Sequence, residues 1–221
     1  MAPRWGWLIL PVLLTGCQGP SKAPTPEGLA PDAPLVLVLG DSLSAGFGVL
    51  PGESYPDHLQ QLITQAGLPH RVQNAGVSGD TTAGGLSRTP WLLKQHPQVV
   101  VLELGANDGL RGLPPAQTRK NLEAIVAACQ KSGAQVLLVG MKLPANYDPA
   151  QRRAFDGVYP NLAEKYHLPL VPFLLEGIVF QRELMQPDGI HPNAQGHRRM
   201  ADLVWKALAP MLPAAPAPPG K

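Results

Sequence analysis

The chain has 221 residues and a formal net charge of +2, with 44% hydrophobic residues and 5% aromatic ones. This length is enough for one domain with a substantial core. The small net charge and the lack of a basic cluster in the sequence give no reason to expect a nucleic-acid partner.

The first 16 residues read as a signal peptide. Arg4 supplies a positive charge, and the apolar run WGWLILPVLL at 5–14 is shorter than the ~20 residues that cross a bilayer. The following LTGC at 14–17 resembles the lipobox of bacterial lipoproteins, in which cleavage precedes a cysteine that becomes lipid-modified. An ordinary signal peptide with an incidental Cys17 is the alternative, although no A-x-A-like cleavage site precedes it. We predict a lipidated Cys17 and a membrane anchor in the bacterial cell envelope, facing the periplasm.

Proline is frequent at both ends of the chain. Residues 17–34 are rich in Pro, Gly and Ala and are predicted to be a tether, whereas residues 210–221 are predicted to be a disordered tail rich in Pro and Ala. One folded domain is expected between them, over residues 35–209.

Predicted strands and helices alternate through this domain. In chain order, the strands are expected at 35–39, 72–75, 98–104, 135–141 and 168–172, and the helices at 55–66, 83–95, 115–132, 149–165 and, after an Asn193 cap, up to about 208. This alternation predicts a parallel sheet covered by helices on both faces. Cys129 falls on the apolar face of one helix and reads as a buried core thiol.

Polar residues follow the ends of these strands in four blocks. The blocks are GDSLS at 40–44, NAGVSGD at 74–80, GAND at 105–108 and, before the last helix, DGIHP at 188–192. Carboxyl ends of parallel strands meet at one edge of a sheet, where ligands bind. We therefore expect the first three blocks to converge at one edge, within reach of the fourth.

These blocks contain the groups that serine hydrolysis requires. Ser42 is the candidate nucleophile, His191 the base and Asp188 the carboxylate that orients the base. An Asp three residues before a His, with Gly189 between, can fold back onto one imidazole nitrogen. The candidate oxyanion donors are the N–H groups of Ser42 and Gly79 and the side chain of Asn107.

Taken together, the four blocks resemble the GDSL, or SGNH, hydrolase superfamily, whose four named residues match Ser42, Gly79, Asn107 and His191. GDSLSAG, NDGLRG, LPANY at 143–147 and DGIHPN carry a closer resemblance to its bacterial thioesterase I, lysophospholipase L1 and arylesterase branch. The chain departs from that branch at Ala106, where relatives often carry Gly. The family implies a flavodoxin-like three-layer α/β/α fold with a central parallel sheet, and ester or thioester hydrolysis without metal or other cofactor.

Other polar residues have a plainer interpretation. Asp41, Asp80 and Asp108 are expected to serve turns and helix caps, with Asp80 capping the helix that follows it. A metal hydrolase built on these acids and His191 is an alternative, but no two histidines lie at ligand spacing. The remaining histidines are expected to be surface or packing residues; they are His58, His70, His96, His167 and His197.

The expected substrates are small-molecule esters or thioesters: aryl esters, fatty acyl thioesters or lysophospholipids. The candidate acyl-binding residues are Leu110, Leu113 and Leu143, and the loop 109–114 is expected to help cover an acyl chain. Two alternatives are a carbohydrate acetyl esterase on the same fold and a surface lipoprotein without activity. We expect a monomer.

Overall fold

A central sheet of five parallel strands forms the middle of the domain in the computed structural model, which describes residues 32–213. The strand order is β2-β1-β3-β4-β5. The strands are β1 (Leu35–Gly40), β2 (Arg71–Asn74), β3 (Val99–Glu103), β4 (Gln135–Val139) and β5 (Leu170–Val171). This is the flavodoxin-like order, so the predicted fold class is confirmed.

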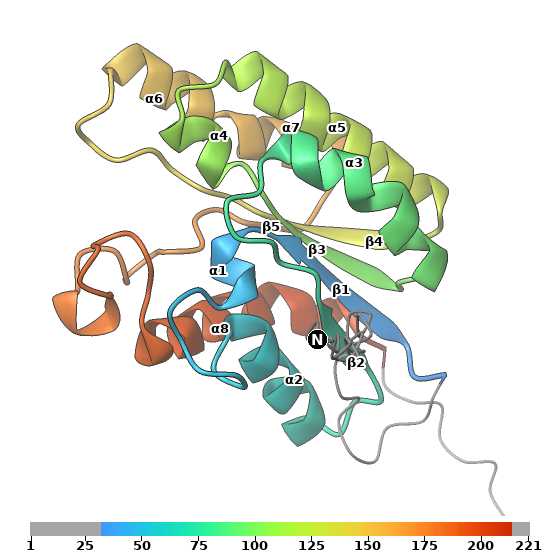
Figure 1. The fold of residues 1–221 in the computed structure, drawn as a ribbon. Helices are drawn as coiled ribbons and strands as arrows, with labels where there is room; N and C mark the ends of the chain where they lie inside the picture. The colour runs from blue at the N-terminus through green and yellow to red at the C-terminus, as the bar shows by residue number, and fades with distance from the viewer. Residues whose placement is uncertain (1–31, 214–221) are drawn as a thin grey trace, which may run out of the picture.

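Helices cover both faces of the sheet (Figure 1), as α3, α5, α6 and α7 lie on one face and α2 and α8 on the other. Their bounds are α2 (Tyr55–Gln65), α3 (Thr82–Leu92), α5 (Pro115–Lys131), α6 (Pro149–Asp156), α7 (Val158–Tyr166) and α8 (Ala194–Leu208). Every residue of β1 and β3 is buried, because both central strands are covered on two sides. This explains their nearly continuous runs of Leu and Val.

The strand order reverses direction between β1 and β3. From β1 the chain crosses to β2 at one edge, and then returns to place β3 on the other side of β1. In open α/β sheets ligands bind at such a switch point, beyond the carboxyl ends of the strands. Two short helices start there, α1 (Ser42–Ala45) after β1 and α4 (Ala106–Leu110) after β3.

Several boundaries differ from those predicted. The helix expected over 149–165 is divided at Gly157, because Pro160 has no N–H to donate and its ring excludes a continuous helix through the preceding turn. The helix expected over 83–95 ends at Leu92 and continues as a 3-10 helix, Leu93–Gln95. Further 3-10 helices are Arg182–Leu184 and Ala209–Met211.

The end of the folded domain also differs from the prediction. The helix Ala209–Met211 carries the chain past residue 209, and Leu212 is buried against the core. The folded segment therefore extends over residues 210–213. The Pro- and Ala-rich composition of this segment gave no indication that Leu212 would pack against the core. The predicted signal peptide, Cys17, most of the tether and residues 214–221 lie outside the described residues.

The core contains Cys129, as predicted. Its side chain is fully buried, and this burial raises the pKa of the thiol to about 12. Over residues 32–213, the helices are all too short or too polar to serve as membrane spans.

Candidate active site

Ser42 is the first residue of α1, directly beyond the end of β1. Asp41 caps this helix, because its Oδ1 accepts the Leu43 N–H at 3.0 Å. The Ser42 hydroxyl lies 3.0 Å from Nε2 of His191. Two blocks that are 149 residues apart in the sequence therefore meet at hydrogen-bond distance.

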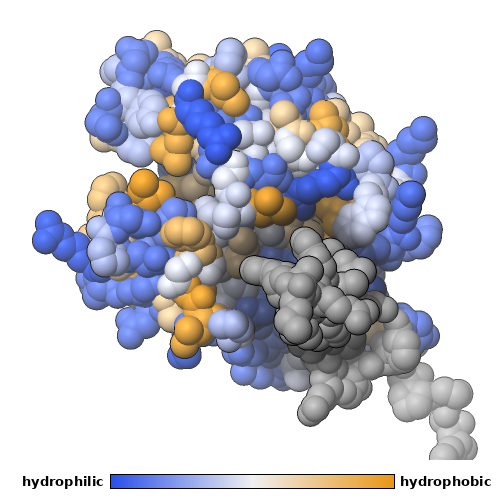
Figure 2. All heavy atoms as spheres, in the orientation of Figure 1, coloured by the Kyte–Doolittle hydropathy of each residue, from blue (hydrophilic) through white to orange (hydrophobic). Residues whose placement is uncertain are grey.

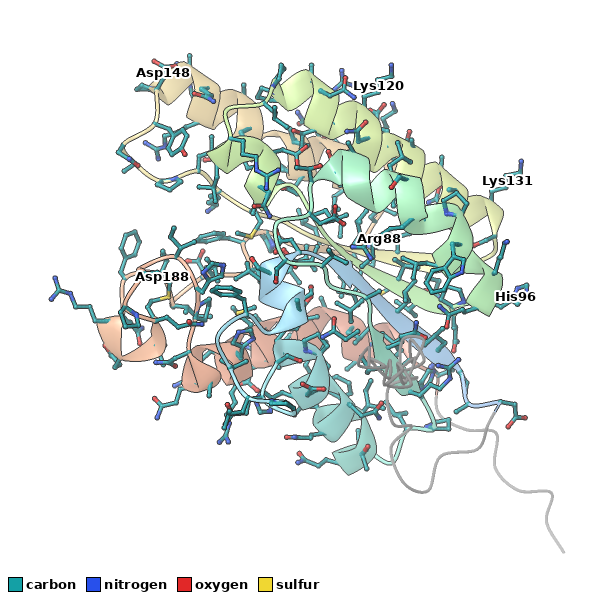
Figure 3. The ribbon with its side chains drawn as sticks, in the orientation of Figure 1. Arg88, His96, Lys120, Lys131, Asp148 and Asp188 are labelled. Atoms are coloured by element: carbon teal, nitrogen blue, oxygen red, sulfur yellow. The ribbon has the colours of Figure 1, made fainter. Side chains whose placement is uncertain are left out.

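Asp188 lies on the other side of the His191 ring, on the loop before α8 (Figure 3). Its Oδ2 is 2.7 Å from Nδ1 of His191, and its Oδ1 accepts the N–H groups of Ile190 and His191 at 2.9 and 3.0 Å. Gly189 permits this tight return with a φ of 69°. Partial burial would raise the pKa of Asp188, but the hydrogen bonds from His191 and Ile190 lower it to about 2.

The charge of Asp188 determines the tautomer of a neutral His191. An ionised carboxylate only accepts hydrogen bonds, so the imidazole proton resides on Nδ1 and Nε2 is left unprotonated. The Ser42 O–H then donates to Nε2. This is the arrangement that the predicted nucleophile, base and orienting acid require.

A second contact holds His191 from its ring face. The Phe47 ring lies 4.6 Å from the imidazole, centroid to centroid, at an interplanar angle of 40°. Gln186 joins the two segments, since its Nε2 donates to the Phe47 carbonyl at 2.7 Å and its N–H to the His191 carbonyl at 2.8 Å. Neither Phe47 nor Gln186 was singled out from the sequence, because nothing in the pattern indicates which loops meet.

The predicted oxyanion donors lie on the chain segments that follow β1, β2 and β3, at the carboxyl ends of these strands. Within the described residues, neither the N–H of Ser42 nor that of Gly79 donates to a protein acceptor. Gly79 adopts a φ of 80°, and an added Cβ would meet only Arg111, at 3.5 Å. Both N–H groups are thus available to a ligand atom.

Asn107 is held by Asp41, the residue that precedes Ser42. Its Nδ2 donates to Oδ2 of Asp41 at 3.1 Å, which leaves the second hydrogen of that amide without a protein partner. Gly105 makes the turn into α4 with a φ of 118°, where a Cβ would collide with the hydroxyl of Tyr159. Asp41 is therefore more than the cap that the sequence predicted, because it also orients Asn107.

A buried acid that the sequence reasoning missed lies beneath α1. Glu103, at the end of β3, accepts the Ser44 hydroxyl at 2.7 Å and the Asp41 N–H at 3.3 Å, and Ser44 also bonds the Tyr55 hydroxyl at 2.9 Å. Burial and the adjacent Asp41 raise the pKa of Glu103 well above its usual range. Burial likewise raises the pKa of Asp41, to about 6. The sequence did carry one indication of Glu103, which is the only charged residue in the apolar run VVVLEL at 99–104.

Arg88 on α3 fixes the loop that carries Gly79. Its guanidinium donates to the Gly40 carbonyl at 2.9 Å, to the Ala75 carbonyl and to Asp80 at 2.8 Å. The predicted cap role of Asp80 is wrong, because Thr81 is the N-cap of α3. Asp80 instead forms an ion pair with Arg88, which links the ends of β1 and β2.

The three predicted acyl-binding leucines occupy different environments. Leu110, the last residue of α4, and Leu113, on the loop after it, are exposed at 40% and 38%, whereas Leu143 is 5% exposed and packs with Phe155 beneath Gly109. Leu143 therefore belongs to the core and supports this loop rather than offering free surface. The loop is tied to its surroundings by Arg111, which donates to the Gly79 carbonyl at 2.8 Å.

The remaining polar residues have structural surroundings. Asp108 is buried and accepts from the backbone and hydroxyl of Thr82. His58, His70 and His197 are buried, while His96 and His167 make turns with positive φ. Over residues 32–213, His, Cys, Asp and Glu form no cluster of three suited to a metal ion.

A family model described as the GDSL-like lipase/acylhydrolase family matches residues 38–199, which span every part of this site. The chain belongs to this family. Esterase TesA of Pseudomonas aeruginosa is 45% identical over 181 residues, covering 81% of this chain and 90% of that one. The thioesterase 1/protease 1/lysophospholipase L1 of Escherichia coli K12 is 42% identical and covers 81% and 86%.

A solved structure agrees with the fold of this GDSL-like acylhydrolase. The crystal structure of the psychrotrophic esterase EstA from Pseudoalteromonas sp., inhibited by monoethylphosphonate, superposes with a TM-score of 0.76. The two chains are 33% identical, and the match covers 80% of this chain and 97% of that one. The sequence resemblance to the GDSL family is thereby confirmed, whereas the roles of individual residues stay predictions.

Proposed function

We propose that this GDSL-like acylhydrolase is a serine esterase in which Ser42, His191 and Asp188 form the catalytic triad. The observation that carries the proposal is the continuous chain of contacts from Ser42 Oγ to His191 Nε2, at 3.0 Å, and from His191 Nδ1 to Asp188, at 2.7 Å. Related proteins are named esterase and thioesterase. Both reactions are acyl transfers to water.

The proposed reaction runs through an acyl-enzyme. Ser42 Oγ attacks the carbonyl carbon of the ester while His191 Nε2 takes the hydroxyl proton, and the ester carbonyl oxygen becomes an oxyanion. The N–H groups of Ser42 and Gly79 and the free amide hydrogen of Asn107 stabilise that charge. His191 then protonates the departing alcohol or thiol. Water, deprotonated by His191, attacks the acyl-enzyme, and collapse of the second oxyanion releases the acid and restores Ser42.

The proposed substrates are aryl esters, acyl thioesters and lysophospholipids. Leu110 and Leu113 supply exposed apolar surface next to Asn107, which suits an acyl chain better than a sugar. A panel of p-nitrophenyl esters and acyl-CoA thioesters of increasing chain length, run beside acetylated xylan, separates these substrates from the carbohydrate alternative. A preference for acetylated xylan would overturn the acyl-chain proposal.

The nucleophile is tested by a fluorophosphonate probe, which labels activated serines covalently. We expect the wild type to be labelled and Ser42→Ala not to be, with turnover lower by about 10³-fold or more. Ser87→Ala, which removes an exposed hydroxyl on α3, is the matched control and should behave like the wild type. Labelling that persists in Ser42→Ala would refute this nucleophile, and an unlabelled wild type would favour the surface lipoprotein without activity.

We also propose that the mature protein begins at a lipidated Cys17 and is anchored in the cell envelope, facing the periplasm. The LTGC sequence after the apolar run supports this proposal. Two or more acyl chains hold a protein on a membrane stably, whereas one does not. Mass spectrometry of the mature N-terminus should find a lipid-modified Cys17, and Cys17→Ser should block processing or release the protein. An unmodified protein that starts elsewhere would refute the anchor.

A further inference from the structure

The large apolar side chains that remain exposed are gathered on one edge of the domain. Of the eight such residues among those described, only Trp91 lies away from the carboxyl ends of the strands, at the end of α3. Leu110 and Leu113 follow β3 and have been described above. The other five follow β1, β2 and β5, and we call them the apolar rim: Phe47, Leu50, Val77, Phe180 and Ile190.

The apolar rim borders the candidate active site. Phe47 packs against the imidazole of His191, and Ile190 precedes His191 on the same loop. In Figure 2 apolar surface lies on both sides of a hollow on the left of the view, where Figure 1 places the loops after α1 and before α8. The rim is therefore continuous with the place where an ester would react.

Two rim residues extend further into solvent than ligand contact requires. Phe180 is 96% exposed and Leu50 is 69% exposed, so neither forms a wall of an enclosed cleft. A small ester bound beside Ser42 would leave both side chains in water. A broad apolar surface is needed to cover them, because monomeric proteins rarely leave large apolar patches uncovered without an interaction role.

Charge does not provide the attraction. Within four residues of a rim side chain the sequence carries one arginine, Arg182, against five acidic residues: Glu53, Asp80, Glu176, Glu183 and Asp188. An anionic surface would gain nothing from this balance. The rim fits an uncharged surface with a hydrocarbon interior, such as a zwitterionic phospholipid bilayer, into which aliphatic and aromatic side chains insert at the headgroup boundary.

The chain before the domain is long enough for this orientation. β1 begins at the edge opposite the rim, and the 18 peptide steps from Cys17 to Leu35 can span up to about 60 Å. A domain of this size has a radius of gyration of about 16 Å. A membrane anchor at Cys17 therefore permits the rim to face the same membrane.

We propose that the apolar rim docks the candidate active site onto a phospholipid surface, from which ester substrates enter. The proposal rests on the proposed function only for the position of the reacting serine, and it does not require a lipid on Cys17. Docking brings the loop with Leu110 and Leu113 to the depth of the acyl chains. It also excludes bulk water from the approach to Ser42.

Vesicle binding without turnover tests the docking. The chain from Gln18 onward, which contains the whole described domain, is sedimented with large unilamellar phosphatidylcholine vesicles at 0.1 and 0.5 M NaCl. Leu50→Ser combined with Phe180→Ser removes the two most exposed rim side chains, and Trp91→Ser removes a large exposed apolar side chain elsewhere. We expect the double variant to bind about tenfold more weakly or worse, and Trp91→Ser to bind like the wild type at both salt concentrations.

Hydrolysis of p-nitrophenyl acetate in the absence of vesicles checks that each variant is folded, and we expect it to be unchanged in both. Failure of the wild type to bind, loss of its binding at 0.5 M NaCl, or equal loss in Trp91→Ser would overturn the proposal. So would a wild-type dimer that the double variant dissociates, because a second copy would then cover the rim. The fluorophosphonate experiment reports on Ser42 alone, so failure of docking and failure of the triad remain distinct.

Discussion

Replacing Asn107 by Ala tests the proposed role of Asn107 as a donor to the oxyanion. The substitution keeps Ser42, His191 and Asp188 in place and removes one proposed donor to the charge that develops in the transition state. The expected loss is about 10²–10³-fold in kcat, with KM little changed, because the ground-state carbonyl carries much less charge than the oxyanion. Fluorophosphonate labelling should slow but persist.

The structure adds a cost to stability that can be measured separately. Asp41 is 1% exposed, and Asn107 supplies one of its hydrogen bonds, at 3.1 Å. Without this partner a buried carboxyl oxygen is left unsatisfied, which costs about 1–3 kcal/mol in the free energy of unfolding. Asn121→Ala is the matched control, because the Asn121 amide is also buried and donates to Thr82 at 2.9 Å. It should lower stability to a similar extent and leave kcat nearly unchanged.

The assay is steady-state hydrolysis of p-nitrophenyl butyrate, with urea unfolding of the same preparations. A rise in KM alone for Asn107→Ala would make Asn107 a ground-state binder and refute its place in the oxyanion hole. An equal loss of kcat in Asn121→Ala would refute the argument in another way. The catalytic effect would then follow from loosened packing rather than from the missing donor.

Three further predictions concern the surroundings of the triad. Folding raises the pKa of Asp41 from 3.8 to about 6. Its contribution to the free energy of unfolding is therefore complete below pH 3.8 and is lost as the pH rises through 6. The loss in the free energy of unfolding is about 3 kcal/mol. Glu103 acts in the same direction, and urea unfolding from pH 4 to 8 should show a smaller decline in Asp41→Asn than in the wild type. Leu110→Ser with Leu113→Ser should reduce kcat/KM for octanoyl esters more than for acetyl esters, and equal losses would count against acyl contact. Arg88→Lys keeps the positive charge but loses the planar guanidinium that donates to Gly40, Ala75 and Asp80, so kcat should fall about tenfold. Unchanged turnover would mean that the loop carrying Gly79 holds its position without the guanidinium.

The fold was predictable because its strands are simple. Continuous apolar runs such as VVVL in β3, each followed by a helix, indicate a parallel sheet without knowledge of any contact. Boundaries were less predictable where a single residue decides them, as Pro160 does for the division between α6 and α7. The short helix α1 was missed because its residues read equally well as a turn.

In the candidate site, too, some residues could be predicted from the sequence and others could not. Ser42, His191 and Asp188 were predicted from residue types in blocks at strand ends, and the structure places them in contact. Glu103 and Gln186 were missed, since their importance comes from partners that are distant in the sequence. A buried acid next to another acid is visible only after β1 and β3 are known to be neighbours.

The proposed base and its proposed orienting acid share one short loop, whereas the proposed nucleophile lies at the edge of the sheet. His191 and Asp188 are three residues apart and joined by both side-chain and backbone hydrogen bonds, while Ser42 meets them through a single contact. Local opening of the segment before α8 would therefore carry the pair away as an intact unit. Such an opening would switch the serine between reactive and inert states in one step, without melting of the sheet. Thermal inactivation would then precede global unfolding and be reversible on cooling.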